Sequence, residues 1–152
     1  QEIRNIIHNL TPPRFREYDL IPLLQELLDE YDHYSAISVH FQAPSDGKPK
    51  GTVPENVKFQ AYRILQEALT NTIKHSGADQ AWVRLEKNKN HLYLHIEDNG
   101  EGFDTSLIES QNKGLGLENM KLRAELLNGS MTIKTNRQGT LLRIKLPLHQ
   151  AV

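Results

Sequence analysis

Three polar side chains share one stripe of an expected helix, and their chemical types suit a phosphate-bearing ligand. The stretch QEALTNTIKH, residues 66–75, contains Glu67, Asn71 and Lys74. At about 100° per residue, Asn71 and Lys74 both lie within roughly 40° of Glu67. A carboxamide oxygen can ligate Mg²⁺, a lysine can contact phosphate, and a carboxylate can orient water. A solvated helix flank with an ordinary Glu67 to Asn71 hydrogen bond is the simpler interpretation, and the helix alone favours it.

The apolar side of the same helix adjoins this stripe. Roughly 60° to 160° from Glu67 on the helical wheel lie Val57, Ala61, Ile64, Leu65, Ala68 and Thr72. The polar stripe therefore borders the buried face, a position that faces a cleft more often than bulk solvent. His75 falls at roughly 80°, on the apolar side, so we expect it to pack or to hydrogen-bond structurally.

A first glycine motif, DNGEGF at residues 98–103, follows directly on an expected strand. Asp98 could accept a hydrogen bond from an exocyclic amine, and Gly100 and Gly102 would let the backbone approach a flat ring closely. A tight turn explains Asp-Asn-Gly as well, and for this motif alone the turn is the favoured interpretation.

A second glycine motif, KGLGLENM at residues 113–120, places Gly114 and Gly116 at the entrance of an expected helix. Free N–H groups and the helix dipole favour anions there, although a glycine-containing helix cap explains the motif equally well. Neither motif is a GxxxxGK[ST] or GxGxxG loop. The signal lies in the set, because the helix stripe, the strand-end aspartate and the helix-entrance glycines follow one another within residues 67–116.

Composition limits the classes of protein to consider. The chain has 152 residues, 38% apolar residues, 24% charged residues and a net charge of -1. One domain is expected, and nucleic acid is an unexpected partner because there is no basic excess. With no cysteine, disulfides, thiolate metal sites and cysteine nucleophiles are excluded, which favours a reducing, cytoplasmic setting. No apolar run reaches the roughly 20 residues of a membrane helix, and the start without Met suggests a piece of a longer parent, whose own membrane anchoring stays open.

Alternation and helical periodicity predict a two-layer α/β sandwich. Helices are expected over residues 1–10, from 20 with Asp19 as its cap, over 54–75 with a stop at Gly77, and over about 115–128; strands are expected over 36–42, 81–86, 91–97, 130–135 and 140–148. Within the first strand, Ile37, Val39 and Phe41 should face inward. The last four strands form two hairpins, so one mostly antiparallel sheet should be covered on one face by helices.

The ordered motifs resemble the N, G1 and G2 boxes of the GHKL ATPase superfamily. The segments that carry the resemblance are ALTNTIKHSGA, EDNGEGF and KGLGLENMKLRAELLNGSMTIKTNRQGTLLRIKLPL. More narrowly, residues 52–148 resemble the catalytic ATP-binding domain of bacterial sensor histidine kinases that partner LuxR-like response regulators. The start, IRNIIHNLTPP, resembles the end of a dimerisation helix. The resemblance implies a dimerisation helix end and linker at 1–15 and a catalytic (HATPase) domain at 16–152, with a Bergerat-type mixed sheet and about three helices.

The resemblance also implies roles for individual residues. Asn71 would ligate Mg²⁺, Asp98 would recognise the adenine amine, and Lys74 would contact phosphate and take part in catalysis. Glu67 is a catalytic candidate only, because the corresponding acid activates water in hydrolases, whereas a phosphotransferase needs its base beside the accepting imidazole. The remaining implied cofactor contacts are Gly100 and Gly102 at the adenine, Gly114, Leu115 and Gly116 at the phosphates, and Thr140 near the adenine, through water. The lid at about 104–112 is short, so nucleotide should be held loosely until a partner helix docks.

The family phosphorylates a histidine that is followed by an acidic residue, and no such pair exists here. His8 is followed by Asn9, so we interpret it as structural. The chain should therefore bind ATP and Mg²⁺ and supply the γ-phosphoryl group to a histidine of a dimerisation domain that it lacks, for relay to a response regulator. An anti-sigma-factor-type serine kinase is one alternative, and a nucleotide-sensing interaction module without phosphotransfer is another. The helical start favours the histidine kinase, and intact Asn71 and Asp98 argue against the module.

Overall fold

Five strands form one mixed sheet in the order β1-β2-β3-β5-β4. The computed structural model describes residues 13–44, 53–102 and 116–149, so the expected helix at 1–10, the lid at 104–112, Gly114 and Leu115 lie outside the described residues. Its helices are α2 (Arg14–Glu17), α3 (Leu20–Tyr34), α4 (Glu55–Asn71), the π-helical turn η1 (Thr72–Ser76) and α6 (Leu117–Leu126); its strands are β1 (Ser38–Gln42), β2 (Gln80–Lys87), β3 (His91–Asp98), β4 (Ser130–Asn136) and β5 (Gly139–Pro147).

Antiparallel pairing dominates the sheet. Both predicted hairpins are confirmed, since β2 pairs with β3 and β4 with β5, and β3 joins them by pairing antiparallel with β5. Only the edge strand β1 runs parallel to its neighbour, with Ser38 opposite Gln80. The expected fold class, a mixed but mostly antiparallel sheet under about three helices, is therefore confirmed.

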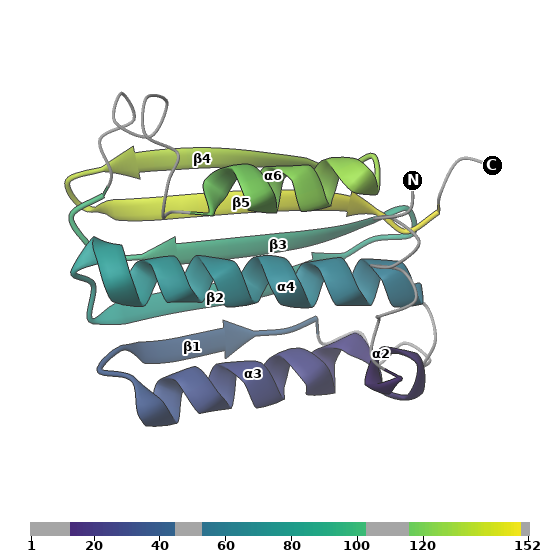
Figure 1. Ribbon diagram of the computed structural model, residues 1–152, viewed down its shortest axis with the longest axis horizontal. Helices are drawn as coiled ribbons and strands as arrows, with labels where there is room; N and C mark the ends of the chain where they lie inside the picture. Colours follow the sequence, from purple (N-terminus) through teal and green to yellow (C-terminus); the bar gives the residue numbers. More distant parts are fainter. Residues whose placement is uncertain (1–12, 45–52, 103–115, 150–152) are drawn as a thin grey trace.

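Helices α3, α4 and α6 cover one face of the sheet, and the described part of the chain leaves the other face open (Figure 1). Alternation along the strands sends Val83, Leu94 and Ile144 into the layer between sheet and helices. The helices supply, among others, Leu24, Leu28, Ile64, Leu65 and Met120, each 2% exposed or less. On the opposite face, Trp82 stays 41% exposed. No helix in the described ranges is both long and apolar enough to cross a bilayer.

Helix α3 begins where the sequence predicts. Asp19 occupies the cap position, yet its side chain caps no backbone N–H, so that part of the prediction is not confirmed. Its leucines Leu20, Leu23, Leu24, Leu27 and Leu28 are buried as expected. The hydroxyl groups of Tyr31 and Thr70 lie 3.0 Å apart and link α3 to α4.

The helix that carries the polar stripe widens into the π-helical turn before it ends at Gly77. The Ser76 hydroxyl donates to the Thr72 carbonyl at 2.5 Å inside this turn. A π-helical residue rotates by less than the 100° of an α-helix, because the turn holds more residues. The turn therefore buries Ser76 and leaves His75 exposed, so the expectation that His75 packs on the apolar side is wrong.

Candidate functional site

The three sequence motifs meet at one end of the molecule, at left in Figure 1. The end of α4 with η1, the end of β3, the turn between β4 and β5, and the start of α6 all lie there. Asp98 pairs with Thr140 across β3 and β5, and the Thr72 hydroxyl lies 3.4 Å from an oxygen of Asp98. Side chains separated by many residues in sequence are thus neighbours in the fold.

Asp98 is a buried carboxylate held in a fixed orientation. Only 6% of the residue is exposed, and the Gly100 N–H donates to its Oδ1 at 2.9 Å. Burial raises the pKa of Asp98, while backbone hydrogen bonds from Gly100 and Thr140 and the Thr72 hydroxyl act in the opposite direction. The donors keep the carboxylate oriented, and a carboxylate has lone pairs for more than these contacts. Asp98 can therefore accept a further hydrogen bond from an amine.

The glycines after Asp98 allow close packing of backbone on backbone. A Cβ at Gly100 would overlap the carbonyl oxygen of Ser76, to which the Glu101 N–H donates at 2.8 Å. Gly102 has φ 79°, and a Cβ there would overlap the carbonyl oxygen of Asn136. These two positions need glycine for the protein's own packing, and their approach to a flat ring stays a prediction.

Glu67 and Asn71 line a pocket of about 290 Å³ together with Gln66, Thr70 and Gly116. Asn71 is only 8% exposed, so the polar stripe does border the buried side of α4. Gly116 is the cap residue of α6, and a Cβ at that position would lie 3.9 Å from Glu67 Oε2. Two residues of the helix stripe, Glu67 and Asn71, and Gly116 of the second glycine motif therefore face the same pocket.

Lys74 and Thr140 are placed differently from these pocket residues. Lys74 lies in η1 with an exposed side chain and is not among the residues that line the pocket. Thr140 is 4% exposed, and its hydroxyl lies 3.0 Å from that of Thr135. Thr140 thus lies buried beside Asp98, whereas Lys74 is exposed on η1, outside the lining of the pocket.

The structure adds Arg123, which the sequence reasoning missed. Its Nε lies 3.7 Å from Glu67 Oε1, and its Nη1 donates to Gln60 Oε1 at 3.0 Å. Burial lowers the pKa of Arg123, and the Glu67 carboxylate opposes this shift. On α6 this arginine borders the stripe of Leu117, Met120 and Ala124, so the argument applied to Glu67 could have found it.

The donor set fits a magnesium-bound phosphate compound. Within the described ranges, no three His, Cys, Asp or Glu residues cluster to hold a metal by themselves. Mg²⁺ usually keeps water and phosphate oxygens and takes few protein ligands, which the Asn71 carboxamide could supply. Glu67 Oε2 is buried with no hydrogen-bond partner among the described residues, so one oxygen of the pocket remains available.

Comparison with known proteins places the chain in one family. Residues 56–150 match the family described as histidine kinase-, DNA gyrase B- and HSP90-like ATPase (HATPase_c). Over 97% of its length the chain is 37% identical to the signal transduction histidine-protein kinase/phosphatase DegS of Bacillus subtilis (strain 168), covering 43% of that protein. It is 34% identical to DegS of Brevibacillus brevis, covering 97% of this chain and 37% of that one. The chain thus spans about two fifths of these relatives.

Solved structures agree on the fold. The histidine kinase domain of the blue-light activated histidine kinase EL346 of Erythrobacter litoralis superimposes with a TM-score of 0.71 at 22% identity, over 86% of this chain and 61% of that one. Acinetobacter baumannii histidine kinase AdeS gives 0.69 at 18% identity, over 88% of this chain and 66% of that one. The chain belongs to the family of histidine kinase-, DNA gyrase B- and HSP90-like ATPases, and nearly its whole length is similar to part of a protein named as a signal transduction histidine-protein kinase.

Proposed function

We propose that this chain binds Mg-ATP and supplies the γ-phosphoryl group to a histidine in a dimerisation domain of its parent protein. The proposal rests on the buried Asp98 carboxylate, which contacts Thr72, lying at the same end of α4 as the pocket of Glu67 and Asn71, in a member of this ATPase family. In this proposal residues 1–15 are the end of a dimerisation helix and a linker, and residues 16–152 are the catalytic domain.

The nucleotide's base would occupy the end of the site at β3. Asp98 would accept the exocyclic amine of adenine, because its carboxylate is buried and already oriented by the Gly100 N–H at 2.9 Å. Thr140, beside it on β5, would contact the base through water. Asp98 would discriminate strongly between adenine and a base that lacks the exocyclic amine, because such a base would leave the buried carboxylate without a hydrogen-bond donor.

The phosphates would lie toward the start of α6. Asn71 would hold Mg²⁺ through its amide oxygen, and the backbone N–H groups that open α6 after Gly116 would face phosphate oxygens. Lys74, exposed on η1, would contact the phosphates as a point charge. When bound there, Mg²⁺ would supply positive charge that offsets the charge of the phosphates during transfer of the γ-phosphoryl group.

Glu67 is the candidate for handling the proton. Transfer forms a bond between an imidazole nitrogen and phosphorus and breaks the bond to the leaving ADP oxygen, and the imidazole must be neutral to attack. The unpartnered Oε2 of Glu67 could orient or deprotonate that imidazole, while Oε1 stays 3.7 Å from Arg123 Nε. Arg123 would hold the Glu67 carboxylate in position.

The partners follow from the same proposal. The parent's own dimerisation domain would donate the histidine, and a LuxR-like response regulator would receive the phosphoryl group. The domain would work in the cytoplasm, with or without a membrane anchor elsewhere in the parent. Several relatives are named as histidine kinases, among them YxjM of Bacillus subtilis (strain 168) at 35% identity, which favours this function over the serine kinase and the interaction module.

Calorimetric titration of ATP, with and without Mg²⁺, tests the nucleotide part. Loss of a hydrogen bond to a charged group is worth about 1.5–3 kcal/mol, so Asp98→Asn should weaken binding by roughly 10- to 150-fold. Glu97→Gln is the matched control, because it makes the same charge change one residue earlier on β3, on the opposite face of the sheet. No ATP binding to the folded wild-type chain, or equal effects of the two substitutions, would overturn the assignment.

The phosphotransfer part needs the accepting domain. The chain, γ-labelled ATP and the separately produced dimerisation domain of its parent should together yield label on that domain that acid removes and base does not, as expected for phosphohistidine. Label that survives acid would indicate a hydroxyl acceptor and the serine kinase alternative. ATP binding without any transfer to this domain would favour the interaction module.

A further inference from the structure

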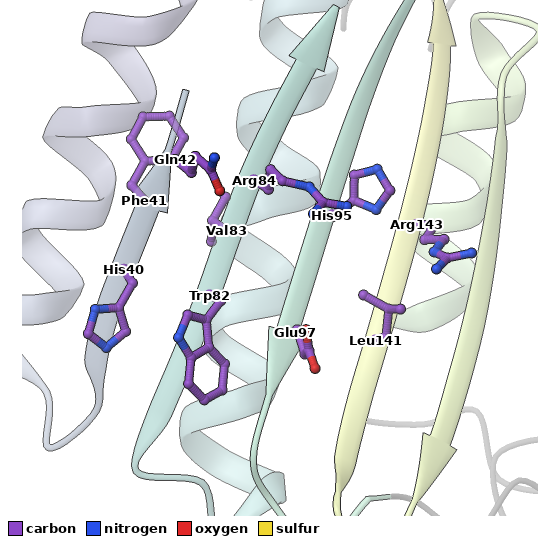
Figure 2. Close-up of a pocket in the computed structure, with 10 residues that line it drawn as sticks. All are labelled: His40, Phe41, Gln42, Trp82, Val83, Arg84, His95, Glu97, Leu141 and Arg143. Carbon is purple, nitrogen blue, oxygen red and sulfur yellow. The ribbon is translucent and has the colours of Figure 1, made fainter. Parts of the chain in front are cut away.

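The open face of the sheet carries a second cavity, unrelated to the nucleotide site. Its volume is about 500 Å³, and its lining comes from β1, β2, β3 and β5 (Figure 2). The lining residues include His40, Trp82, Arg84, His95, Glu97 and Arg143. None of them belongs to the proposed nucleotide site, which lies on the helix-covered side. A cavity of this size is in the range that small organic ligands occupy.

One side of the cavity is an aromatic platform. The rings of His40 and Trp82 stack with centroids 5.8 Å apart and an interplanar angle of 19°. His40 Nε2 lies 2.6 Å from the side-chain oxygen of Gln80, so its ring is fixed in place. Trp82, the single tryptophan of the chain, is 41% exposed. A planar apolar group can bury this surface by stacking on it.

Two arginines flank the middle of the cavity. Arg84 on β2 and Arg143 on β5 both stand in register with His95 on the strand between them. Arg84 Nε pairs with Glu86 at 2.9 Å, whereas no acidic side chain within residues 13–44, 53–102 and 116–149 pairs with Arg143. Guanidinium groups recognise planar carboxylates through paired hydrogen bonds.

His95 lies in register between these two arginines. Burial lowers its pKa, and the charges of Arg84 and Arg143 lower it further, against the opposing charge of Glu86. His95 Nδ1 is buried and has no hydrogen-bond partner among the described residues. Burial is the largest cause of this shift; only the smaller part that comes from the charges of Arg84 and Arg143 would also attract an anion.

We propose that this cavity binds a small planar aromatic carboxylate, with its ring against Trp82 and its carboxylate turned toward the end of the cavity that carries Arg84, His95 and Arg143 (Figure 2). Glu97 fixes the orientation, because it lines the cavity next to Trp82 and repels a carboxylate there. The site does not depend on the proposed kinase function. It also leaves the nucleotide site open, since Glu97 and Asp98 are consecutive residues of β3 that point to opposite faces.

An NMR titration of the ¹⁵N-labelled chain with sodium benzoate at constant ionic strength tests the site directly. Trp82 gives the single indole N–H signal, and that signal should shift along a saturable curve with a millimolar Kd, as expected for so small a ligand. Benzamide, which lacks the charge, and cyclohexanecarboxylate, which lacks the aromatic ring, should each bind at least tenfold more weakly. Saturating Mg-ATP should leave the benzoate curve unchanged.

The double variant Arg84→Gln/Arg143→Gln should weaken benzoate binding at least tenfold. Lys145→Gln is the control, because it removes a positive charge from the same face at a residue that does not line the cavity. Benzoate should also raise the pKa of His95, followed by ¹³C-labelled imidazole signals. Equal shifts with benzamide, an unaffected double variant with a well-dispersed spectrum, or no saturation of the indole signal would each overturn the proposal.

Discussion

Arg123 and its two partners yield a stability prediction of stated size. Arg123→Met keeps much of the side-chain stem and removes the guanidinium, which donates to Gln60 Oε1 at 3.0 Å and lies 3.7 Å from Glu67 Oε1. Gln60 is 7% exposed, so its oxygen would be left without this donor at a cost of about 1–3 kcal/mol.

The ion pair adds less to stability than its Coulomb energy suggests. Charges about 4 Å apart attract by roughly 4 kcal/mol at an effective dielectric constant of about 20, and the desolvation of both groups offsets most of this. The two side chains are 22% and 23% exposed. We therefore expect Arg123→Met to lower the free energy of unfolding by about 2 kcal/mol, and Tm by roughly 4–8 °C.

Urea denaturation at constant m-value measures this change. Lys121→Met is the matched control, because it removes a positive charge from an exposed position of the same helix and should alter stability by less than about 0.5 kcal/mol. Glu67→Gln should have a smaller effect than Arg123→Met, because a carboxamide oxygen can still face the guanidinium, and the double variant should show coupling of about 1 kcal/mol. Equal destabilisation by Arg123→Met and Lys121→Met would show that the contacts of Arg123 with Gln60 and Glu67 do not stabilise the fold.

Two further predictions concern the loop after β3 and the open face of the sheet. Gly100→Ala places a Cβ against the carbonyl oxygen of Ser76, a backbone atom that cannot move cheaply, so the free energy of unfolding should fall by about 1–3 kcal/mol in urea denaturation; an unchanged midpoint would contradict this packing. For His95, the folded-state pKa is lowered from 6.5, so its contribution to stability is complete above that value and is lost as pH falls through the folded-state pKa. The free energy of unfolding of His95→Gln should therefore fall less than that of the wild type between about pH 7.5 and about pH 5.5. Equal falls for the wild type and the variant would contradict this prediction.

The sequence was sufficient to predict the elements and their faces. The leucines of α3 repeat at helical spacing and are buried, and the alternation in the hairpins matches the buried positions of β2 and β3. These patterns are local, because an element that buries one face must repeat apolar residues at its own period. The residue types of Glu67, Asn71 and Lys74 likewise suggest a phosphate-bearing ligand, and this stays a prediction.

Some local features were beyond periodicity. The helical wheel treats the segment up to residue 75 as a regular α-helix. In the structure the helix widens into η1 at Thr72, and this turn buries Ser76 and exposes His75. A π-helical turn depends on what the helix end packs against, here the loop whose Gly100 lies on the Ser76 carbonyl. A pattern in one helix cannot contain that information.

The assembly of both sites was decided by tertiary structure alone. Strand order places β5 between β3 and β4, which brings Thr140 opposite Asp98 and Arg143 opposite His95. The packing of α6 beside α4 brings Arg123 to Glu67, a partner that no spacing in the sequence indicated. The sequence determined which residues could face inward and what chemistry they carry, because burial periodicity and side-chain type are local properties. Which of these residues contact one another is set by long-range pairing. The energy of such a contact depends on two segments that lie far apart in the chain, and the local sequence of either segment does not show which segment it will pack against.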